Sequence, residues 1–145
     1  MSLLAVVAVV LGLAGGSTLA TTTAAPAKSC TEIGCRSGLK VDWGGLPAAH
    51  PNVSRAKICI QGRCRVMKRR AMKQSYLVIE APLKAGTSRV TYVARGRRGK
   101  VIARGSTNAT STSFQPNGEG CPPICVEFLV HFFEDGSFRW IPPTY

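Results

Sequence analysis

The chain has 145 residues, of which 45% are hydrophobic, and a formal net charge of +12 from 19 Lys and Arg against 7 Asp and Glu. This length suits one domain that buries its own core. The longest apolar run near the N-terminus is too short to be a transmembrane helix.

The first 27 residues have the features of an export signal. The run from Leu3 to Ala14 is almost entirely Leu, Val and Ala. Its length of about 12 residues fits the apolar part of a signal peptide and falls short of the about 20 that span a bilayer. Small residues ending at Ala20 and at Ala27 offer two cleavage sites. We predict a signal peptide and Thr/Ala linker over residues 1–27, and a secreted, extracellular domain over residues 28–145.

Two other interpretations of this segment are weaker. A buried core helix would not be followed at once by a Thr/Ala/Pro linker, and a lipoprotein signal would not place Lys28 just before Cys30. No Lys or Arg precedes Lys28, so only the α-amino group supplies the positive charge of a signal peptide. The mature chain is expected to contain no transmembrane segment.

Alternating apolar and polar residues predict short strands throughout the domain. The expected strands are residues 39–43, 56–60, 76–79, 89–95, 100–103, 107–114 and 125–133, and a last one around Phe138 and Trp140. Glu134-Asp135-Gly136 gives a hairpin signal before the last strand. We expect the Met- and Lys/Arg-rich segment 66–76 to be a basic loop rather than a short helix. These features predict an all-β fold, an immunoglobulin-like β-sandwich of about seven to eight short strands.

Segments 30–35, 37–42, 58–64, 99–103, 115–118 and 121–125 contain all six cysteines. Together they resemble a family of small secreted actinobacterial proteins of unknown function, over most of residues 30–126. The resemblance implies an immunoglobulin-like sandwich, and since no motif in it is catalytic, no functional residue can be carried over. The basic segment Val66–Lys73 and the aromatic end Phe128–Trp140 depart from the family pattern.

Six cysteines in an exported chain predict disulfides. If Gln61-Gly62 is a two-residue turn, Cys59 lies opposite Cys64 with the Cα atoms about 4.5 Å apart, a distance that a disulfide spans. This register also places Ile58 and Ile60 on one face with Arg65 and Arg63, so we expect the hairpin tip to project beyond the core.

The pairing of Cys30, Cys35, Cys121 and Cys125 stays open, because four cysteines allow three connectivities. Bridges from the N-terminal pair to the C-terminal pair would close the longest loops and stabilise the fold most. The C-x4-C and C-x3-C spacings do not fit the usual zinc sites, and no C-x-x-C redox motif occurs. We expect no metal and no cofactor.

No catalytic motif is visible in the sequence. His50 lies in a predicted turn, and His131 and Glu127 lie in the most apolar strand. No Ser occupies a G-x-S-x-G context. We therefore expect a non-enzymatic protein, with a small envelope-acting hydrolase that uses His131 or Glu127 in a cleft as the alternative function.

The basic middle of the domain is the main functional signal. Residues 55–104 contain fifteen Lys or Arg and one acid, Glu80. One predicted cluster comprises Arg63, Arg65, Lys68, Arg69, Arg70 and Lys73, and the other comprises Arg95, Arg97, Arg98, Lys100 and Arg104. Such a surface attracts polyanions.

We expect a cationic binding or structural domain that contacts anionic cell-envelope polymers or a membrane surface. The candidate binding residues are Arg63, Arg65, Lys68, Arg69, Arg70, Arg97, Arg98 and Lys100. We expect Arg63, Arg65, Arg69 and Arg70 to lie on the same side of the domain as Arg97 and Arg98. No aromatic residue interleaves the clusters, so sequence-specific nucleic-acid recognition is not expected. The alternative is a solvated surface that only keeps sheet edges from aggregating.

Overall fold

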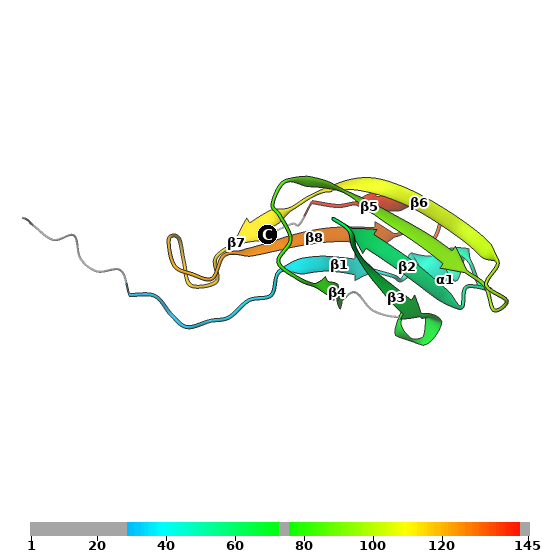
Figure 1. Ribbon diagram of the computed structural model, residues 1–145, viewed down its shortest axis with the longest axis horizontal. Coiled ribbons are helices and arrows are strands. Elements are labelled where there is room, and N and C mark those ends of the chain that lie inside the picture. The colour runs from blue at the N-terminus through cyan, green and yellow to red at the C-terminus, as the bar shows by residue number, and fades with distance from the viewer. Residues whose placement is uncertain (1–28, 73–75, 143–145) are drawn as a thin grey trace, which may run out of the picture.

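The computed structural model describes residues 29–72 and 76–142 of the chain. The predicted signal peptide and linker, residues 1–27, and Lys73 of the first basic cluster lie outside the described residues. The described chain forms two β-sheets that pack face to face as a sandwich (Figure 1). The predicted all-β sandwich is therefore confirmed, whereas its immunoglobulin-like type stays a prediction.

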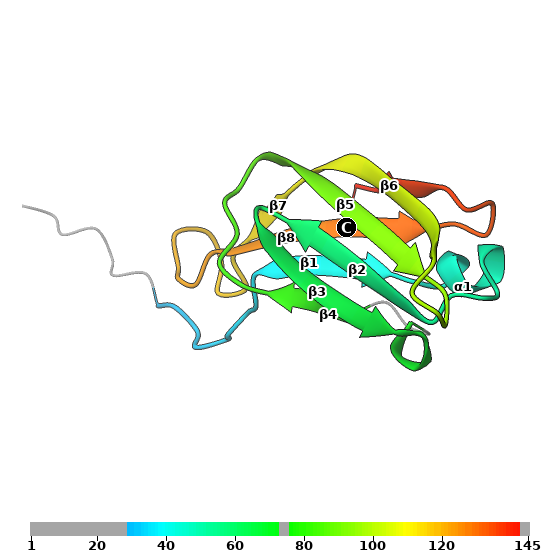
Figure 2. The ribbon, with the colours of Figure 1, turned by 45° about the vertical axis from the view of Figure 1, so that its right-hand side comes forward.

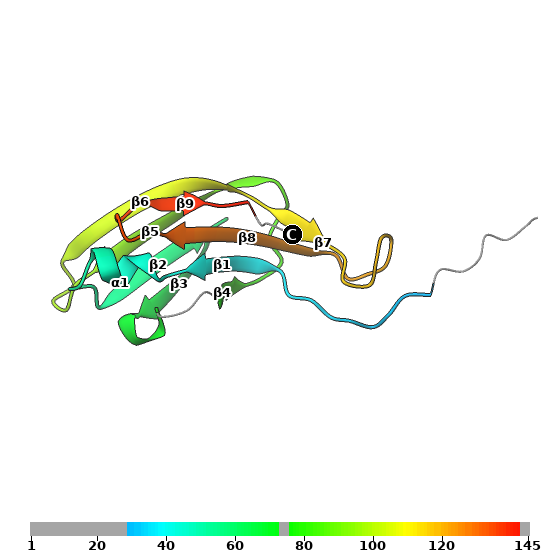
Figure 3. The same ribbon diagram turned by 180° about the vertical axis from the view of Figure 1, so that it is seen from behind.

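One sheet has five strands in the order β4-β1-β8-β7, with β9 also paired to β8. Its strands are β1 (Gly38–Asp42), β4 (Tyr76–Glu80), β7 (Thr112–Phe114), β8 (Cys125–Phe132) and β9 (Phe138–Trp140). Strand β1 is antiparallel to β4 and parallel to β8. Figure 3 shows β9 beside β8 on the face seen from behind.

The other sheet has four antiparallel strands in the order β3-β2-β5-β6 (Figure 2). They are β2 (Arg55–Ile60), β3 (Arg63–Lys68), β5 (Thr87–Arg95) and β6 (Val101–Thr110). A short helix α1 (Gly45–Ala49) follows β1, and a 3-10 helix η1 (Arg69–Ala71) follows β3.

The core forms where the alternating apolar residues of the two sheets meet. Leu39, Val41 and Trp43 are fully buried, as are Ala56 and Ile58 of the facing sheet. Burial of such apolar surface is the main force that holds two sheets together.

An aromatic cluster fills one part of this core. The ring of Trp43 stacks on Phe132 with the centroids 5.1 Å apart, and Tyr92 meets Phe132 edge-on at 4.7 Å. Offset stacking and edge-to-face contacts are the favourable geometries for aromatic pairs. Phe132 of β8 therefore packs against Trp43, which follows β1, and against Tyr92 of β5 in the facing sheet.

Three predicted segments differ from the structure. The expected strands over residues 100–103 and 107–114 are divided differently: β6 is continuous from Val101 to Thr110, and after Ser111 the chain leaves the four-stranded sheet and enters the five-stranded sheet as β7. Ser111 is fixed to Gly86 by Ser111 N–H to Gly86 O (3.0 Å) and Gly86 N–H to Ser111 Oγ (2.8 Å). Of the expected basic loop over 66–76, the first part is instead the end of β3 followed by η1, because β3 pairs with β2 as far as Lys68, and residues 73–75 lie outside the described residues.

The cysteines form three disulfides. Cys59 pairs with Cys64 across the two-residue turn Gln61-Gly62, and their Cα atoms are 4.1 Å apart. Both turn residues have positive φ, 47° at Gln61 and 75° at Gly62, as a hairpin turn that matches strand twist requires. Ile58 and Ile60 are buried while the Arg residues opposite them are exposed, since β3 is the edge strand of its sheet.

The other two disulfides attach the N-terminal segment to the β7–β8 loop. They join Cys30 to Cys121 and Cys35 to Cys125, so the N-terminal pair is bridged to the C-terminal pair. Asn117 of the loop adds hydrogen bonds: its Oδ1 accepts from Ile33 N–H (2.8 Å), and its Nδ2 donates to Ile33 O (3.1 Å). Segment and loop extend together beyond one end of the sandwich (Figure 1).

Candidate functional site

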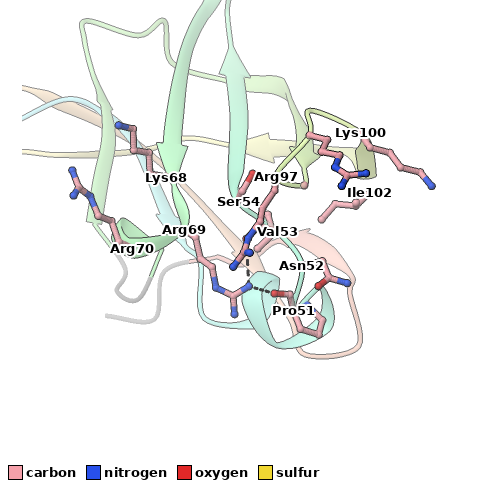
Figure 4. A pocket seen from close by; sticks show the side chains of 12 residues that line it. Pro51, Asn52, Val53, Ser54, Lys68, Arg69, Arg70, Arg97, Lys100 and Ile102 are labelled. Carbon is pink, nitrogen blue, oxygen red and sulfur yellow. Dashed lines mark hydrogen bonds between the residues drawn. The ribbon is translucent and has the colours of Figure 1, made fainter.

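A basic groove of about 1220 Å³ opens at the end of the sandwich where α1 and η1 lie. Three segments line it: residues 51–54 before β2, residues 68–70 at the end of β3, and residues 96–102 around the β5–β6 turn (Figure 4). Six of the lining side chains are cations, namely Lys68, Arg69, Arg70, Arg97, Arg98 and Lys100, and none is Asp or Glu. We call this the basic groove.

Strand register brings these distant segments together. Arg55, the first residue of β2, lies opposite both Lys68, the last residue of β3, and Arg95, the last residue of β5. The antiparallel sheet thus collects the start of β2 and the ends of β3 and β5 at one place. The residues that follow these strand ends form the walls of the groove.

Ser54 fixes the two basic walls relative to each other. Its amide and its hydroxyl both donate to the carbonyl oxygen of Arg95, at 2.9 and 3.0 Å. Its own carbonyl accepts from the amide of Arg69 at 2.9 Å. One half-buried serine therefore links the end of β5 to the start of η1.

The wall formed by the β5–β6 turn is held by its own hydrogen bonds. Gly96 N–H donates to Lys100 O (2.9 Å) and Gly99 N–H donates to Gly96 O (3.0 Å). Arg95 Nη1 donates to Gly99 O at 2.8 Å, and Gly99 takes a φ of 76°, which favours glycine. The turn presents Arg97 and Arg98, both exposed, from a defined backbone.

Arg69 holds the opposite wall against the groove floor. Its Nη1 donates to the carbonyl oxygens of Pro51 and Val53, the second at 3.3 Å (Figure 4). Met72, which is fully buried, anchors η1 to the core and donates from its amide to Arg69 O (3.0 Å). The Arg69 guanidinium is bound to neutral carbonyls, so its charge still contributes to the groove.

Carboxylates do not neutralise the groove. The Arg and Lys ion pairs formed within residues 29–72 and 76–142 lie elsewhere: Arg36–Glu80 (3.3 Å), Lys40–Glu127 (2.7 Å) and Asp135–Arg139 (3.5 Å). Asp42 lies beside His131, with Oδ2 3.4 Å from Nδ1. Positive charges from two segments, residues 68–70 and 97–100, therefore add in one concave place, where an anion is attracted by all of them.

The expectation of one shared cationic side is right for Arg69 and Arg70, which line the groove with Arg97 and Arg98, and wrong for Arg63 and Arg65. Lys68, Arg69, Arg70, Arg97, Arg98 and Lys100 gather around the groove. Arg63 begins β3 beside the Gln61–Gly62 turn and lines a separate hollow of about 560 Å³ with Lys84 at the other end of the sheet. Arg65 pairs with Ile58 in the middle of β3 and does not line the groove. The reason is that residues 63–68 form an extended strand of roughly 20 Å, which separates its two ends.

Two cations next to the groove were missed by sequence reasoning. Arg55 and Lys57 of β2 are exposed and point to the outer face of the sheet, away from the buried Ala56 and Ile58. The sequence contained the information needed to find Arg55, because the register that pairs Cys59 with Cys64 also pairs Arg55 with Lys68.

The residues considered for catalysis lie in different surroundings. Glu127 and His131 sit on the outer face of the five-stranded sheet, and neither lines the basic groove or the smaller hollow. Glu127 forms an ion pair with Lys40, and His131 Nδ1 lies 3.4 Å from Asp42 Oδ2. His50 ends α1 and donates its amide to Leu46 O (3.0 Å). Among the residues that the structure describes, no group of three His, Cys, Asp or Glu is placed to hold a metal ion.

Comparison with known proteins gives no assignment. No protein-family model matches the chain, and neither the curated proteins nor the solved structures contain a significant match. In the described part of the chain, no helix is both long and apolar enough to cross a membrane.

Proposed function

We propose that this chain is an exported, non-enzymatic domain that binds anionic polymers of the cell envelope through the basic groove. The observation that carries the proposal is the gathering of six Lys and Arg residues around one groove with no carboxylate in its lining. Arg supplies planar, charged donors that fit phosphate, sulfate and carboxylate groups, and Lys adds point charges.

Export is supported by two independent features. Residues 1–27 have the composition of a signal peptide and linker. All six cysteines are paired in three disulfides, and such bonds persist in oxidising compartments outside the cytosol. A protein in that location meets the charged polymers of the envelope.

An extended polymer fits this site better than a small anion. The cations are distributed over two segments around an open groove, so a single phosphate contacts only a few of them. A chain with repeated negative charges contacts several at once and releases several counterions, which makes its binding steeply dependent on salt.

The test is retention of the secreted protein on purified cell wall and on heparin across a salt series. We expect retention at low salt and release as the salt concentration rises. The variant Arg97→Gln/Arg98→Gln is expected to release at clearly lower salt than the wild type.

The matched control is Arg63→Gln/Lys84→Gln, which removes the same charge at the other end of the sheet. Charges separated by more than about 10 Å are largely screened at 0.1 M salt, so this variant is expected to elute like the wild type. No retention at low salt, retention that does not respond to salt, or equal loss in both variants would contradict the proposed function.

A further inference from the structure

The outer face of the four-stranded sheet carries cations in direct cross-strand register. Arg55 lies between Lys68 on β3 and Arg95 on β5, so three positive residues form a row across three strands. In the next row, Lys57 lies between Val66 and Val93, and Val93 pairs with Arg104 on β6. We call the set Arg55, Lys57, Lys68, Arg95 and Arg104 the cationic sheet face.

This arrangement is unfavourable for the free protein. Like charges directly opposite each other destabilise a sheet, and an ordinary soluble surface mixes charges of both signs. Strands β2, β3, β5 and β6 contain eight Lys or Arg and no Asp or Glu. A solvated surface with no partner gains nothing from three cations in one row, whereas an anionic partner would relieve their repulsion.

The cationic sheet face is continuous with the basic groove. Lys68 belongs to both. Arg95 Nη1 donates to Gly99 O at 2.8 Å, and Arg55 Nη2 lies 3.5 Å from the position that a Cβ atom on Gly99 would occupy. Two guanidinium groups of the sheet face therefore lie beside the turn that presents Arg97 and Arg98.

We propose that the groove and the cationic sheet face form one track for a flexible, linear phosphodiester polymer that has no bases. This inference rests on the proposed function and specifies both its surface and its ligand class. Neighbouring strands are about 4.8 Å apart, and alternate residues along one strand are about 6.6 Å apart. The cations of the track are thus spaced at intervals that a chain with one phosphate per short repeat can follow.

The side chains between the cations favour a polymer without bases. They are Val66, Val93, Thr91 and Val101, and the lining of the groove contains no aromatic residue either. Tyr92, the aromatic residue of these four strands, points into the core. Proteins that bind single-stranded nucleic acid stack its bases on aromatic side chains, and this surface has no such platform.

The experiment measures binding of the full secreted domain to fluorescently labelled poly(glycerol phosphate) and to oligothymidylate with the same number of phosphates, each across a salt series. The wild type is expected to bind poly(glycerol phosphate) at least as tightly as oligothymidylate. In Arg55→Gln/Lys57→Gln, affinity for poly(glycerol phosphate) is expected to fall several-fold, and the slope of log affinity against log salt to decrease by about 0.7 for each lost contact. The control Arg63→Gln/Lys84→Gln is expected to keep the wild-type slope.

The melting temperature of the free protein is a second measurement. Arg55→Gln is expected to raise the melting temperature by roughly 1 to 5 °C, because Lys68 and Arg95 no longer face a like charge. A folding defect would lower the melting temperature instead. Higher stability together with weaker binding supports the track.

The outcomes separate this inference from the proposed function. If Arg55→Gln/Lys57→Gln binds like the wild type while Arg97→Gln/Arg98→Gln binds more weakly, the cationic sheet face takes no part in binding and the basic groove alone is the binding site. Tighter binding of oligothymidylate overturns the choice of a base-free polymer. Failure of the wild type to bind either probe at low salt overturns both proposals.

Discussion

The carbonyl oxygen of Arg95 accepts two hydrogen bonds from Ser54, one from its amide at 2.9 Å and one from its hydroxyl at 3.0 Å. Because the Ser54 carbonyl also accepts from the Arg69 amide, the two walls of the basic groove are connected through this one residue. The positions of the groove cations thus follow from backbone contacts rather than from flexible side chains alone.

Replacing Ser54 is therefore expected to cost stability. Ser54→Ala removes the hydroxyl bond and keeps the amide bond, so the free energy of unfolding should fall by about 1 kcal/mol. Chemical denaturation checks this value. Ser113→Ala, at an exposed serine of β7, is the control and is expected to change the unfolding free energy by less than about 0.5 kcal/mol. Equal effects in both variants would contradict the role of Ser54.

The two long-range disulfides are expected to substitute for each other in part. Cys30–Cys121 and Cys35–Cys125 span 91 and 90 residues of sequence. When one of these disulfides is formed, the other closes a ring of only about ten residues. Removing a single disulfide should therefore lower the free energy of unfolding by roughly 3 kcal/mol or less. Removing both disulfides also releases the long loop and should lower the free energy of unfolding by roughly 7 kcal/mol.

Paired Cys→Ala variants and thermal or urea unfolding measure these differences. The Cys59–Cys64 disulfide spans 5 residues in an exposed hairpin. Its removal is expected to lower the free energy of unfolding less than removal of either long-range disulfide. A double deletion that costs no more than either single deletion would contradict the chain-entropy argument.

Gly45 allows α1 to lie directly against the end of β8. A Cβ atom at this position would lie 2.2 Å from the carbonyl oxygen of Phe132, so Gly45→Ala must displace backbone. We expect a loss of about 1 to 3 kcal/mol in unfolding free energy. Gly34→Ala is the matched control, because a Cβ atom there meets nothing within 4 Å, and it is expected to be neutral. A neutral Gly45→Ala would contradict the close packing of α1 on β8.

The β8–β9 turn should make a small contribution to the loss of folding stability at acidic pH. Hydrogen bonding from Ser137, whose amide donates to Asp135 Oδ1 at 2.7 Å, together with the nearby Arg139, holds the pKa of the Asp135 carboxyl below its usual value. A lowered pKa in the folded state stabilises the fold above the unfolded pKa of about 3.9, and this contribution is lost as the pH falls through the folded pKa. Asp135→Asn should therefore lose less stability than the wild type between neutral and acidic pH, as unfolding curves at both pH values would show. A steeper loss in the variant would contradict this sign.

The sequence predicted most of the strands and the hairpins at Gln61-Gly62 and Asp135-Gly136, because those signals are local. Alternation placed Leu39, Val41 and Trp43 on a buried face, and the Gln61-Gly62 turn placed Cys59 opposite Cys64. The division at Ser111 was not predictable from β-branched residues alone, since β6 and β7 look like one strand until the second sheet is present to pair with β7.

The groove was only partly predictable, because charge clusters in sequence are not clusters in space. Arg63 and Lys68 are neighbours along the chain but lie at opposite ends of β3. Arg55 was overlooked because it lies outside both basic clusters in the sequence, and only the pairing of β2 with β3 and β5 places it between Lys68 and Arg95.

The most direct test of the account is an NMR titration of the secreted domain with a short poly(glycerol phosphate) at low salt. If the basic groove binds the polymer, the largest amide shift changes should occur at Arg69 and Arg70 and in the turn from Gly96 to Lys100, and they should disappear as salt is added. Shift changes concentrated on β8 and β9, or spread evenly over the domain, would contradict the assignment of the groove as the binding site.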